Sequence, residues 1–389
     1  MTENTRTPAH LILADGTIFS GWSFGAEVES SGEVVFNTSM TGYPELLTDP
    51  SYRKQILTLT YPEIGNYGVA PMDAESSGIQ IAGMVIRSLS PVTSNWRSEL
   101  NLSAWLKEAG VPGIGGIDTR ALVLHLRTKG AMMGIISTDQ NADLAALAAK
   151  AKSLPSMEGM SLSGEVTCAE PTVFEEGLQN DDGSPVPPLR DPSFHVVAID
   201  LGMKRNIARL LVHHGCKVTI VPADTSAESI QALHPDGIFL TNGPGDPATA
   251  GHVVETVRNL LGSRPIFGIC MGHQVLAQAL GASTYKTVFG HRGANQPVKS
   301  VDGRVKITSQ NHGFAVRTQD IVAPAQPSDV NVSDQTNEGL DVPEKMAFSV
   351  QYHPEAAPGP HDSQDFFERC VLMMKEHGNP SADSMHEMK

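Results

Sequence analysis

The residues best suited to catalysis are a cysteine between two glycines and a histidine–glutamate pair near the end of the chain. Cys270 lies in the sequence Gly-Ile-Cys-Met-Gly-His-Gln, after a short apolar run and before a segment with helical periodicity. Such a strand-to-helix turn exposes a nucleophile, and the helix N-terminus behind it favours the thiolate. The N–H group of Met271 would face a developing oxyanion. His353 and Glu355 follow another apolar run and supply a general base and its orienting carboxylate. This combination predicts acyl transfer.

Each of these residues also has a purely structural interpretation. A cysteine in an apolar stretch is usually a small buried side chain, as we expect for the other three cysteines. The flanking glycines and the polar residues that follow favour a catalytic role for Cys270, and the neighbouring Glu355 favours one for His353. The chain order Cys, His, Glu differs from the Ser, Asp, His order of the α/β-hydrolases, which argues against that class.

A second motif, Gly-Pro-Gly-Asp-Pro-Ala at residues 243–248, formally matches a loose nucleotide-binding pattern. Its two prolines remove N–H donors and block the helix start that would hold a pyrophosphate. We interpret it as a rigid loop in which the N–H of Gly243 completes an oxyanion hole with that of Met271. The sequence has no P-loop motif, so no ATP site is predicted in this chain. The histidines are scattered, and the adjacent His213 and His214 cannot face one ion, so no metal site is predicted.

Composition restricts the class of protein. A chain of 389 residues most simply forms two domains. The net charge of −15 and pI near 5.3 argue against nucleic-acid and anionic-membrane partners, which need basic patches. The four cysteines lack metal-like or framework spacing, which indicates a reducing compartment. The polar N-terminus is unlike a signal peptide, and no apolar run approaches a membrane span. We therefore expect a cytoplasmic protein.

The pattern along the chain predicts two α/β domains. Residues 1–152 alternate short apolar runs, helical stretches and turn signals, which indicate a mixed α and β domain with a hairpin around Asp15-Gly16. Residues 153–192 are expected to be a linker, since their second half is rich in proline and acidic residues. Residues 193–380 form the second domain, and residues 381–389 a tail.

The second domain alternates strand and helix patterns, which predicts an open, mostly parallel sheet with helices on both faces. Sites in such sheets lie beyond the carboxyl ends of the strands, and Gly243 and Cys270 both fall there. Residues 305–308 and 347–352 are expected to add antiparallel strands at one side of the sheet.

Three signatures in order make residues 193–380 resemble the class I, triad-type glutamine amidotransferase family: Gly-Pro-Gly-Asp-Pro at 243–247, Gly-Ile-Cys-Met-Gly-His-Gln at 268–274, and His-Pro-Glu at 353–355. Further segments resemble the small-chain family of carbamoyl-phosphate synthase, namely residues 36–43, 47–52, 58–62, 116–120 and 310–314. The resemblance covers nearly the whole chain.

The resemblance implies that Cys270 attacks the side-chain amide of L-glutamine, with His353 and Glu355 completing the triad. It also implies the glutamine contacts, which are Ser51, Gly243, Gly245, Met271, Gln274, Asn311, Gly313 and Phe314. Ser51 comes from the N-terminal domain, so the site is expected near the domain interface. The ammonia would pass to a large synthetase chain, which docks on the N-terminal domain and makes carbamoyl phosphate from bicarbonate for arginine and pyrimidine synthesis. ATP and Mg²⁺ would bind in that large chain, and no cofactor is expected here.

Three alternatives remain at this stage. The chain could be an amidotransferase or γ-glutamyl hydrolase that serves another acceptor, or a regulatory paralogue that has lost the chemistry. The N-terminal half could be a substrate-binding module rather than a docking domain. An intact set of Cys270, His353 and Glu355 argues against the inactive paralogue.

Overall fold

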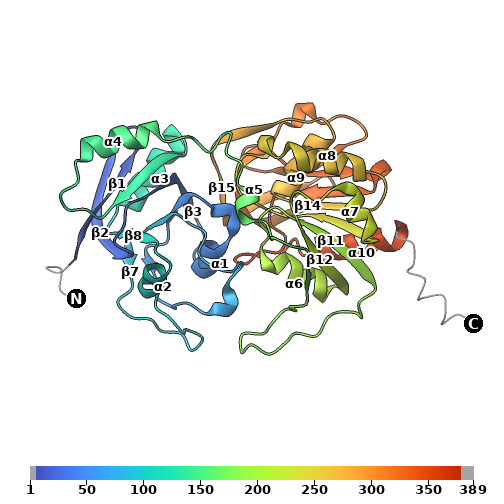
Figure 1. Cartoon of the computed structure of the whole chain (residues 1–389), viewed down its shortest axis with the longest axis horizontal. Helices are drawn as coiled ribbons and strands as arrows, with labels where there is room; N and C mark the ends of the chain where they lie inside the picture. The colour runs from blue at the N-terminus through green and yellow to red at the C-terminus, as the bar shows by residue number, and fades with distance from the viewer. Residues whose placement is uncertain (1–5, 378–389) are drawn as a thin grey trace, which may run out of the picture.

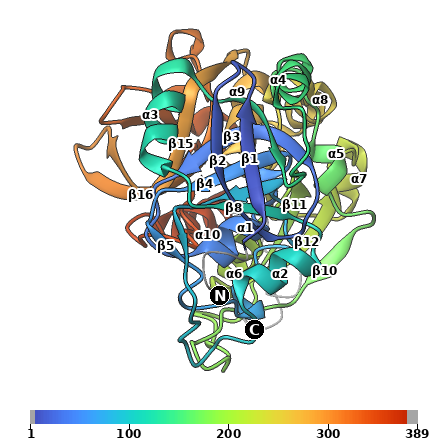
Figure 2. The same cartoon turned by 90° about the vertical axis from the view of Figure 1, so that its left-hand side faces the viewer.

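The computed structural model describes residues 6–377, which form two domains lying side by side (Figure 1). Seven strands of the N-terminal domain close into a barrel. In Figure 2 this domain faces the viewer. In barrel order they are β1 (Pro8–Leu13), β2 (Ile18–Gly25), β8 (Pro112–Gly115), β6 (Gly83–Val85), β4 (Gln55–Leu59), β3 (Ser30–Asn37) and β9 (Met132–Ser137). Closure leaves no unpaired sheet edge.

Apolar side chains from these strands hold the barrel together. Val34, Ile56, Val85, Ile114 and Ile136, each from a different strand, belong to one buried cluster. β-Branched residues of this kind fit the pleated surface of a strand. The predicted hairpin is confirmed, because β1 pairs antiparallel with β2 across the turn.

Helices and short segments surround the barrel, and polar side chains cap three of the α-helices. The caps are Asn101, Asp118 and Asp143, whose side chains accept hydrogen bonds from the first turns of α2, α3 and α4. The elements are α1 (Tyr43–Thr48), α2 (Leu102–Glu108), α3 (Thr119–Lys129), α4 (Leu144–Ser153), the 3-10 helices η2 (Pro50–Tyr52) and η3 (Pro71–Asp73), and the paired strands β5 (Glu63–Ile64) and β7 (Ser88–Leu89).

The C-terminal domain is built on one ten-stranded sheet. A parallel set runs in the order β12 (Cys216–Pro222), β11 (Phe194–Asp200), β13 (Gly237–Leu240), β14 (Ile266–Ile269) and β19 (Ala347–Val350). An antiparallel extension continues with β18 (Asn337–Val342), β17 (Gln326–Asn331), β15 (Thr284–Ser300) and β16 (Val305–Val316). The predicted fold class, a mixed domain followed by an open α/β sheet, is confirmed.

Helices cover both faces of this sheet, as predicted. Two separate buried clusters form, one beneath α7 (Ala227–Ala232), α8 (Gly251–Leu260) and α9 (Met271–Ala279), the other beneath α6 (Arg205–His213) and α10 (Asp365–His377). Short 3-10 helices η4 (Pro247–Thr249), η5 (Thr318–Asp320) and η6 (Pro343–Lys345) complete the domain. No helix within residues 6–377 combines the length and apolar composition that a membrane crossing needs.

Two expectations need correction. The strand expected at residues 347–352 is not part of a purely antiparallel extension, because β19 pairs parallel with β14 on one side and antiparallel with β18 on the other. The segment expected to be a linker is partly structured: it contains α5 (Ser163–Val166), and β10 (Thr172–Phe174) adds an antiparallel edge strand beside β12. Residues 378–380 and the expected tail at 381–389 lie outside the described residues.

Candidate active site

Cys270 occupies the sharp turn between β14 and α9. Its backbone has φ 53° and ψ −103°, an uncommon conformation for a residue with a side chain. The glycines on either side allow this turn, because a Cβ at Gly268 would collide with the backbone of Gly272, and one at Gly272 would collide with the backbone of Leu240. The strand–turn–helix context expected for a nucleophile elbow is therefore present.

Strand pairing brings the histidine of the predicted triad to this turn. Because β19 runs parallel to β14, both strands end at the same edge of the sheet, and the N–H of Cys270 donates to the carbonyl of Val350 over 2.9 Å. His353 lies just beyond that end. Its Nδ1 is 2.6 Å from Oε1 of Glu355, and both side chains are buried. The three predicted catalytic residues are thus gathered at one place.

Burial and charge act in opposite directions on the histidine. Burial disfavours the charged imidazolium, but the Glu355 carboxylate and the Cys270 thiol outweigh it and raise the pKa of His353 to about 10. Burial likewise opposes ionisation of Glu355, yet Lys204 and His353 lower the pKa of its carboxyl to about 2. At neutral pH the pair is therefore imidazolium and carboxylate.

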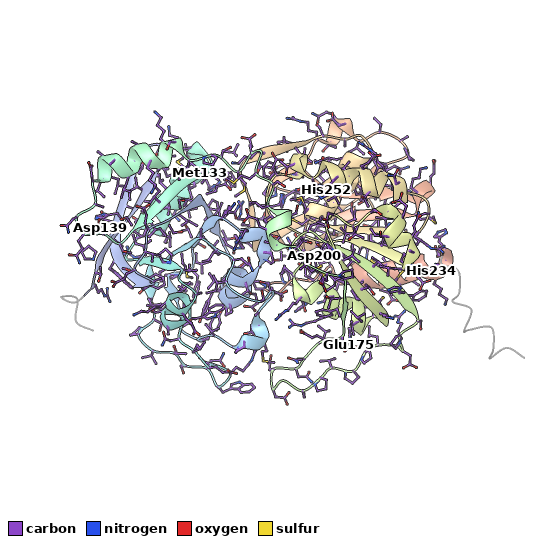
Figure 3. All side chains as sticks on the ribbon, viewed as in Figure 1. Met133, Asp139, Glu175, Asp200, His234 and His252 are labelled. Atoms are coloured by element: carbon purple, nitrogen blue, oxygen red, sulfur yellow. The ribbon has the colours of Figure 1, made fainter. Side chains whose placement is uncertain are left out.

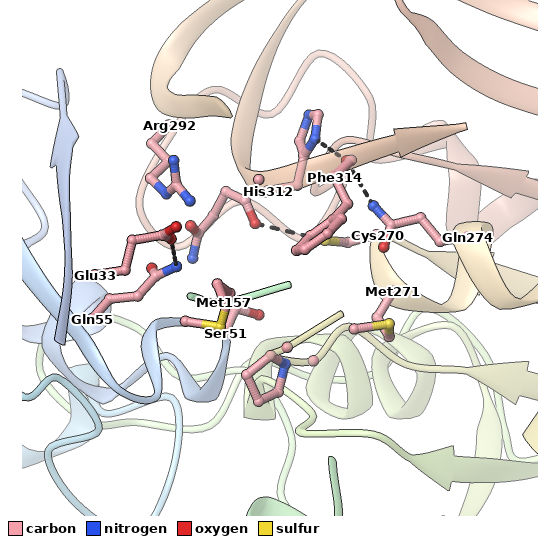
Figure 4. A pocket seen from close by; sticks show the side chains of 15 residues that line it. Glu33, Ser51, Gln55, Met157, Cys270, Met271, Gln274, Arg292, His312 and Phe314 are labelled. Carbon is pink, nitrogen blue, oxygen red and sulfur yellow. Dashed lines mark hydrogen bonds between the residues drawn. The ribbon is translucent and has the colours of Figure 1, made fainter. Parts of the chain in front are cut away.

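A pocket between the two domains collects the predicted glutamine contacts (Figure 4). All eight line it together with Cys270. The predicted residues in the lining are Ser51, Gly243, Gly245, Met271, Gln274, Asn311, Gly313 and Phe314.

Hydrogen bonds across the domain interface hold the Ser51 side of the pocket. Nδ2 of Asn242 donates to Oγ of Ser51 over 2.9 Å, and Nδ2 of Asn311 donates to Oδ2 of Asp49 over 2.8 Å. Asp49 also caps the short helix that carries Ser51 by accepting its N–H over 2.9 Å. One buried carboxylate therefore positions a pocket residue of the barrel domain and one of the C-terminal domain.

Gln274 secures the opposite wall. It lies one turn of α9 beyond Cys270, and its Nε2 donates to the carbonyl of Phe314 over 2.8 Å and to Oε1 of Gln351 over 3.0 Å. Phe314 and Asn311 both lie on β16, and the Cys270 thiol faces this strand, with Sγ 3.6 Å from the carbonyl oxygen of Asn311. These contacts fix the position of the Cys270 side chain relative to β16, which forms this wall of the pocket.

Comparison with known proteins agrees with this geometry. Residues 11–136 match the model of the carbamoyl-phosphate synthase small chain, CPSase domain, and residues 197–373 match that of the class-I glutamine amidotransferases. The chain is 52% identical to the carbamoyl phosphate synthase small chain of Syntrophotalea carbinolica over 95% of its own length and 98% of the relative. It is 50% identical to the carbamoyl phosphate synthase small chain of Vibrio vulnificus, again over 95% of its own length and 98% of the relative.

The chain belongs to the carbamoyl-phosphate synthase small-chain family.

Several residues that line the pocket or contact the triad were missed by sequence reasoning. Lys204 contacts Glu355, and it could have been found because it follows the carboxyl end of β11, at the same sheet edge as Cys270. Asp49 lies within a segment that carries the resemblance, but nothing local indicated its role. The other missed pocket residues are Glu33, Gln55, Met157, Pro244, Arg292 and His312. Met157 comes from the expected linker, whose N-terminal part therefore closes the site.

Proposed function

We propose that this chain is the glutaminase subunit of a carbamoyl-phosphate synthase: it hydrolyses L-glutamine and delivers ammonia to a large synthetase chain. The observation that carries the proposal is the single pocket that joins all eight expected glutamine contacts to Cys270. Family membership and the amidotransferase domain support it. The remaining reaction, which uses bicarbonate, ATP and Mg²⁺, belongs to the large chain, so this chain requires no cofactor of its own for the glutaminase step. The complex works in the cytoplasm.

The site supports the first half of the reaction through its charge state. The imidazolium of His353 stabilises a thiolate at Cys270, and the thiolate attacks the side-chain amide carbon of glutamine. The negative oxygen of the tetrahedral intermediate is received by the N–H groups of Met271 and Gly243. Met271 is the first residue of α9, whose leading N–H groups have no partner within the helix. The C–N bond then breaks as His353 gives its proton to the leaving ammonia.

The second half uses the same groups in reverse. Once His353 has lost its proton, its neutral ring accepts one from a water molecule, and the resulting hydroxide attacks the γ-glutamyl thioester. Glutamate leaves and the thiolate–imidazolium pair is restored. Glu355 keeps the histidine ring in one orientation throughout, because its carboxylate remains ionised.

Replacement of the nucleophile tests the proposal. In a complex with the large chain, Cys270→Ser should abolish carbamoyl phosphate synthesis from glutamine and leave synthesis from free ammonium unchanged. Cys370→Ser is the matched control, since Cys370 is a buried cysteine on α10. Normal glutamine-dependent synthesis in the Cys270 variant would overturn the assignment.

A γ-glutamyl hydrolase serving another acceptor is the alternative function. Residues of both domains line the pocket, so a partner that shifts one domain relative to the other would change the arrangement of the site. Conformational steps of this kind often limit kcat. If the proposal is right, the large chain with bicarbonate and ATP raises the glutaminase kcat more than about tenfold, at least ~1.4 kcal/mol of coupling. Equal glutamate release with and without the large chain would favour the hydrolase.

A further inference from the structure

Beside the glutamine pocket, three chemically complementary side chains meet in the antiparallel part of the sheet. They are His291 on β15, His312 on β16 and Glu338 on β18, and one ligand atom from each lies within 4.8 Å of the others. All three are buried, with exposed fractions of 8%, 5% and 0%. His291 and His312 are direct partners in the β15–β16 pairing, which sets the two rings in one place.

The outer nitrogen of each ring is already held. His312 Nδ1 lies 2.7 Å from the carbonyl oxygen of Phe314, which can only accept, so this nitrogen carries the proton and Nε2 presents a lone pair. His291 Nε2 lies 2.8 Å from Oδ2 of Asp334. A histidine that binds a metal through one nitrogen commonly donates its other N–H to a carboxylate or a backbone carbonyl in this way.

Of the three atoms that face the centre of the cluster, the two ring nitrogens lack a hydrogen-bond partner among the described residues. Within residues 6–377, Nδ1 of His291 and Nε2 of His312 are buried and have no hydrogen-bond partner. Oε1 of Glu338 lies 3.5 Å from Nδ1 of His291 and accepts a hydrogen bond from Nδ2 of Asn331 over 3.3 Å, while its Oε2 accepts one from Gln310 over 2.8 Å. Protonation of His291 would allow an ion pair with Glu338, but it would leave the lone pair of His312 unused. Buried polar atoms rarely remain unpaired.

We propose that His291, His312 and Glu338 bind a divalent cation of the zinc class. Two imidazoles and one carboxylate are a donor set that zinc uses, whereas magnesium and calcium prefer oxygen ligands alone. Coordination requires Nδ1 of His291 to be deprotonated, so binding releases any proton held there. Glu338 and Asp334 together supply two negative charges, which also compensate the positive charge that Arg292 places near His312.

The ion would stabilise the strand that forms one wall of the glutamine pocket. His312 lies between Asn311 and Gly313, two of the pocket residues expected to contact glutamine. A bound ion would tie that part of β16 to β15 and β18. This inference is independent of the glutaminase proposal, because it rests on residues outside the triad and its test measures metal binding.

Metal titration of the full chain provides the test. Cys270→Ser serves as the parent, so that the nucleophilic thiolate cannot bind the metal. After removal of metal with a chelator, we expect the parent to take up one equivalent of Zn²⁺ by calorimetry and by elemental analysis. Glu338→Gln and His291→Asn should each weaken that affinity at least about tenfold. His252→Asn is the matched control, an exposed histidine on α8 (Figure 3), and should bind as the parent does.

Two results would overturn the proposal: failure of the parent to bind one equivalent of Zn²⁺, or unchanged affinity in both cluster variants. Co²⁺ in the parent gives a decision that does not depend on the folding of any cluster variant. A strong tetrahedral cobalt spectrum without thiolate bands supports the site, and the weak spectrum of hydrated cobalt contradicts it.

Discussion

Lys204 Nζ lies 3.0 Å from Oε1 of Glu355, the same carboxylate oxygen that His353 contacts. Burial disfavours the charge on Lys204, but the carboxylates of Glu355, Glu75 and Asp49 raise the pKa of its ammonium above the usual value. Glu75 belongs to the barrel domain, and its Oε2 accepts the N–H of Asn206 over 3.0 Å, which anchors the start of α6 beside Lys204. The orientation of the triad therefore depends on both domains.

Loss of the Lys204 ammonium should weaken the fold as well as the reaction. Lys204→Met leaves the buried Glu355 with one cation instead of two, and removal of one member of a buried ion pair costs about 3 kcal/mol or more. We expect this loss in the free energy of unfolding measured with urea, together with a lower glutaminase kcat. Lys217→Met, an exposed position on β12, is the control. Equal stability of both variants would show that the Lys204–Glu355 contact contributes nothing.

His353 and Glu355 should differ in how much each contributes to kcat. His353→Asn removes the group that transfers protons, so kcat should fall about 10⁴-fold or more. Glu355→Gln removes only orientation and charge stabilisation, and should retain about a hundredfold more activity than the histidine variant. Single-turnover release of glutamate separates the chemical step from later steps. Unchanged kcat in both variants would make His353 and Glu355 structural residues.

The His353–Glu355 pair should also make stability depend on pH. The folded-state pKa of His353, about 10, lies above its unfolded value, so the pair's stabilisation is complete below pH ~6.5 and is lost as the pH rises toward 10. The pKa of Glu355, about 2, lies below its unfolded value, so its contribution is present above pH ~4.5 and is lost as the pH falls toward 2.

Comparison of Glu355→Gln with the parent at two pH values measures this effect. The difference in unfolding free energy should be largest between pH ~4.5 and ~6.5 and should shrink at pH 9. Glu344→Gln, at an exposed position, should show no such change. A difference that grows with pH would contradict the assigned direction of the His353 shift.

Asp49 should control the affinity for glutamine. Its carboxylate accepts hydrogen bonds from Ser51 of the barrel domain and from Asn311 of the C-terminal domain. Asp49→Asn turns an acceptor into a donor that faces other donors, and such an unsatisfied buried group costs about 1–3 kcal/mol. The KM for glutamine should rise at least about tenfold, with a smaller change in kcat, measured in steady-state assays. Asp139→Asn is the exposed control, and an equal KM in both variants would remove Asp49 from the site.

Local sequence was sufficient for the turn at Cys270 and for the general fold. The turn at Cys270 depends on its two flanking glycines and on the strand and helix beside it, all contiguous in the chain. Alternating strand and helix patterns predicted the parallel sheet, and the rule for strand ends located Cys270 and Gly243 at one edge. The glutamine contacts came from the family resemblance, and the roles of those residues remain predictions.

Long-range pairing decided what sequence reasoning missed. The residue pattern of a strand does not indicate which strand it pairs with or in which direction. The parallel pairing of β19 with β14, which brings His353 to Cys270, was therefore not predicted. The same holds for β10, which joins the sheet from the expected linker. The approach of His291, His312 and Glu338 also depends on which strands of the sheet adjoin, and scattered histidines in the sequence give no sign of it.

The sequence by itself determined the chemistry of this protein, because a nucleophile elbow and a histidine–glutamate pair are encoded in short contiguous segments. Only the tertiary structure decided the electrostatics of the site. Lys204, Glu75 and Asp49 act on the triad and pocket from distant positions of the chain. Their effect arises from burial and distance, since charges influence each other strongly only when folding removes the water between them.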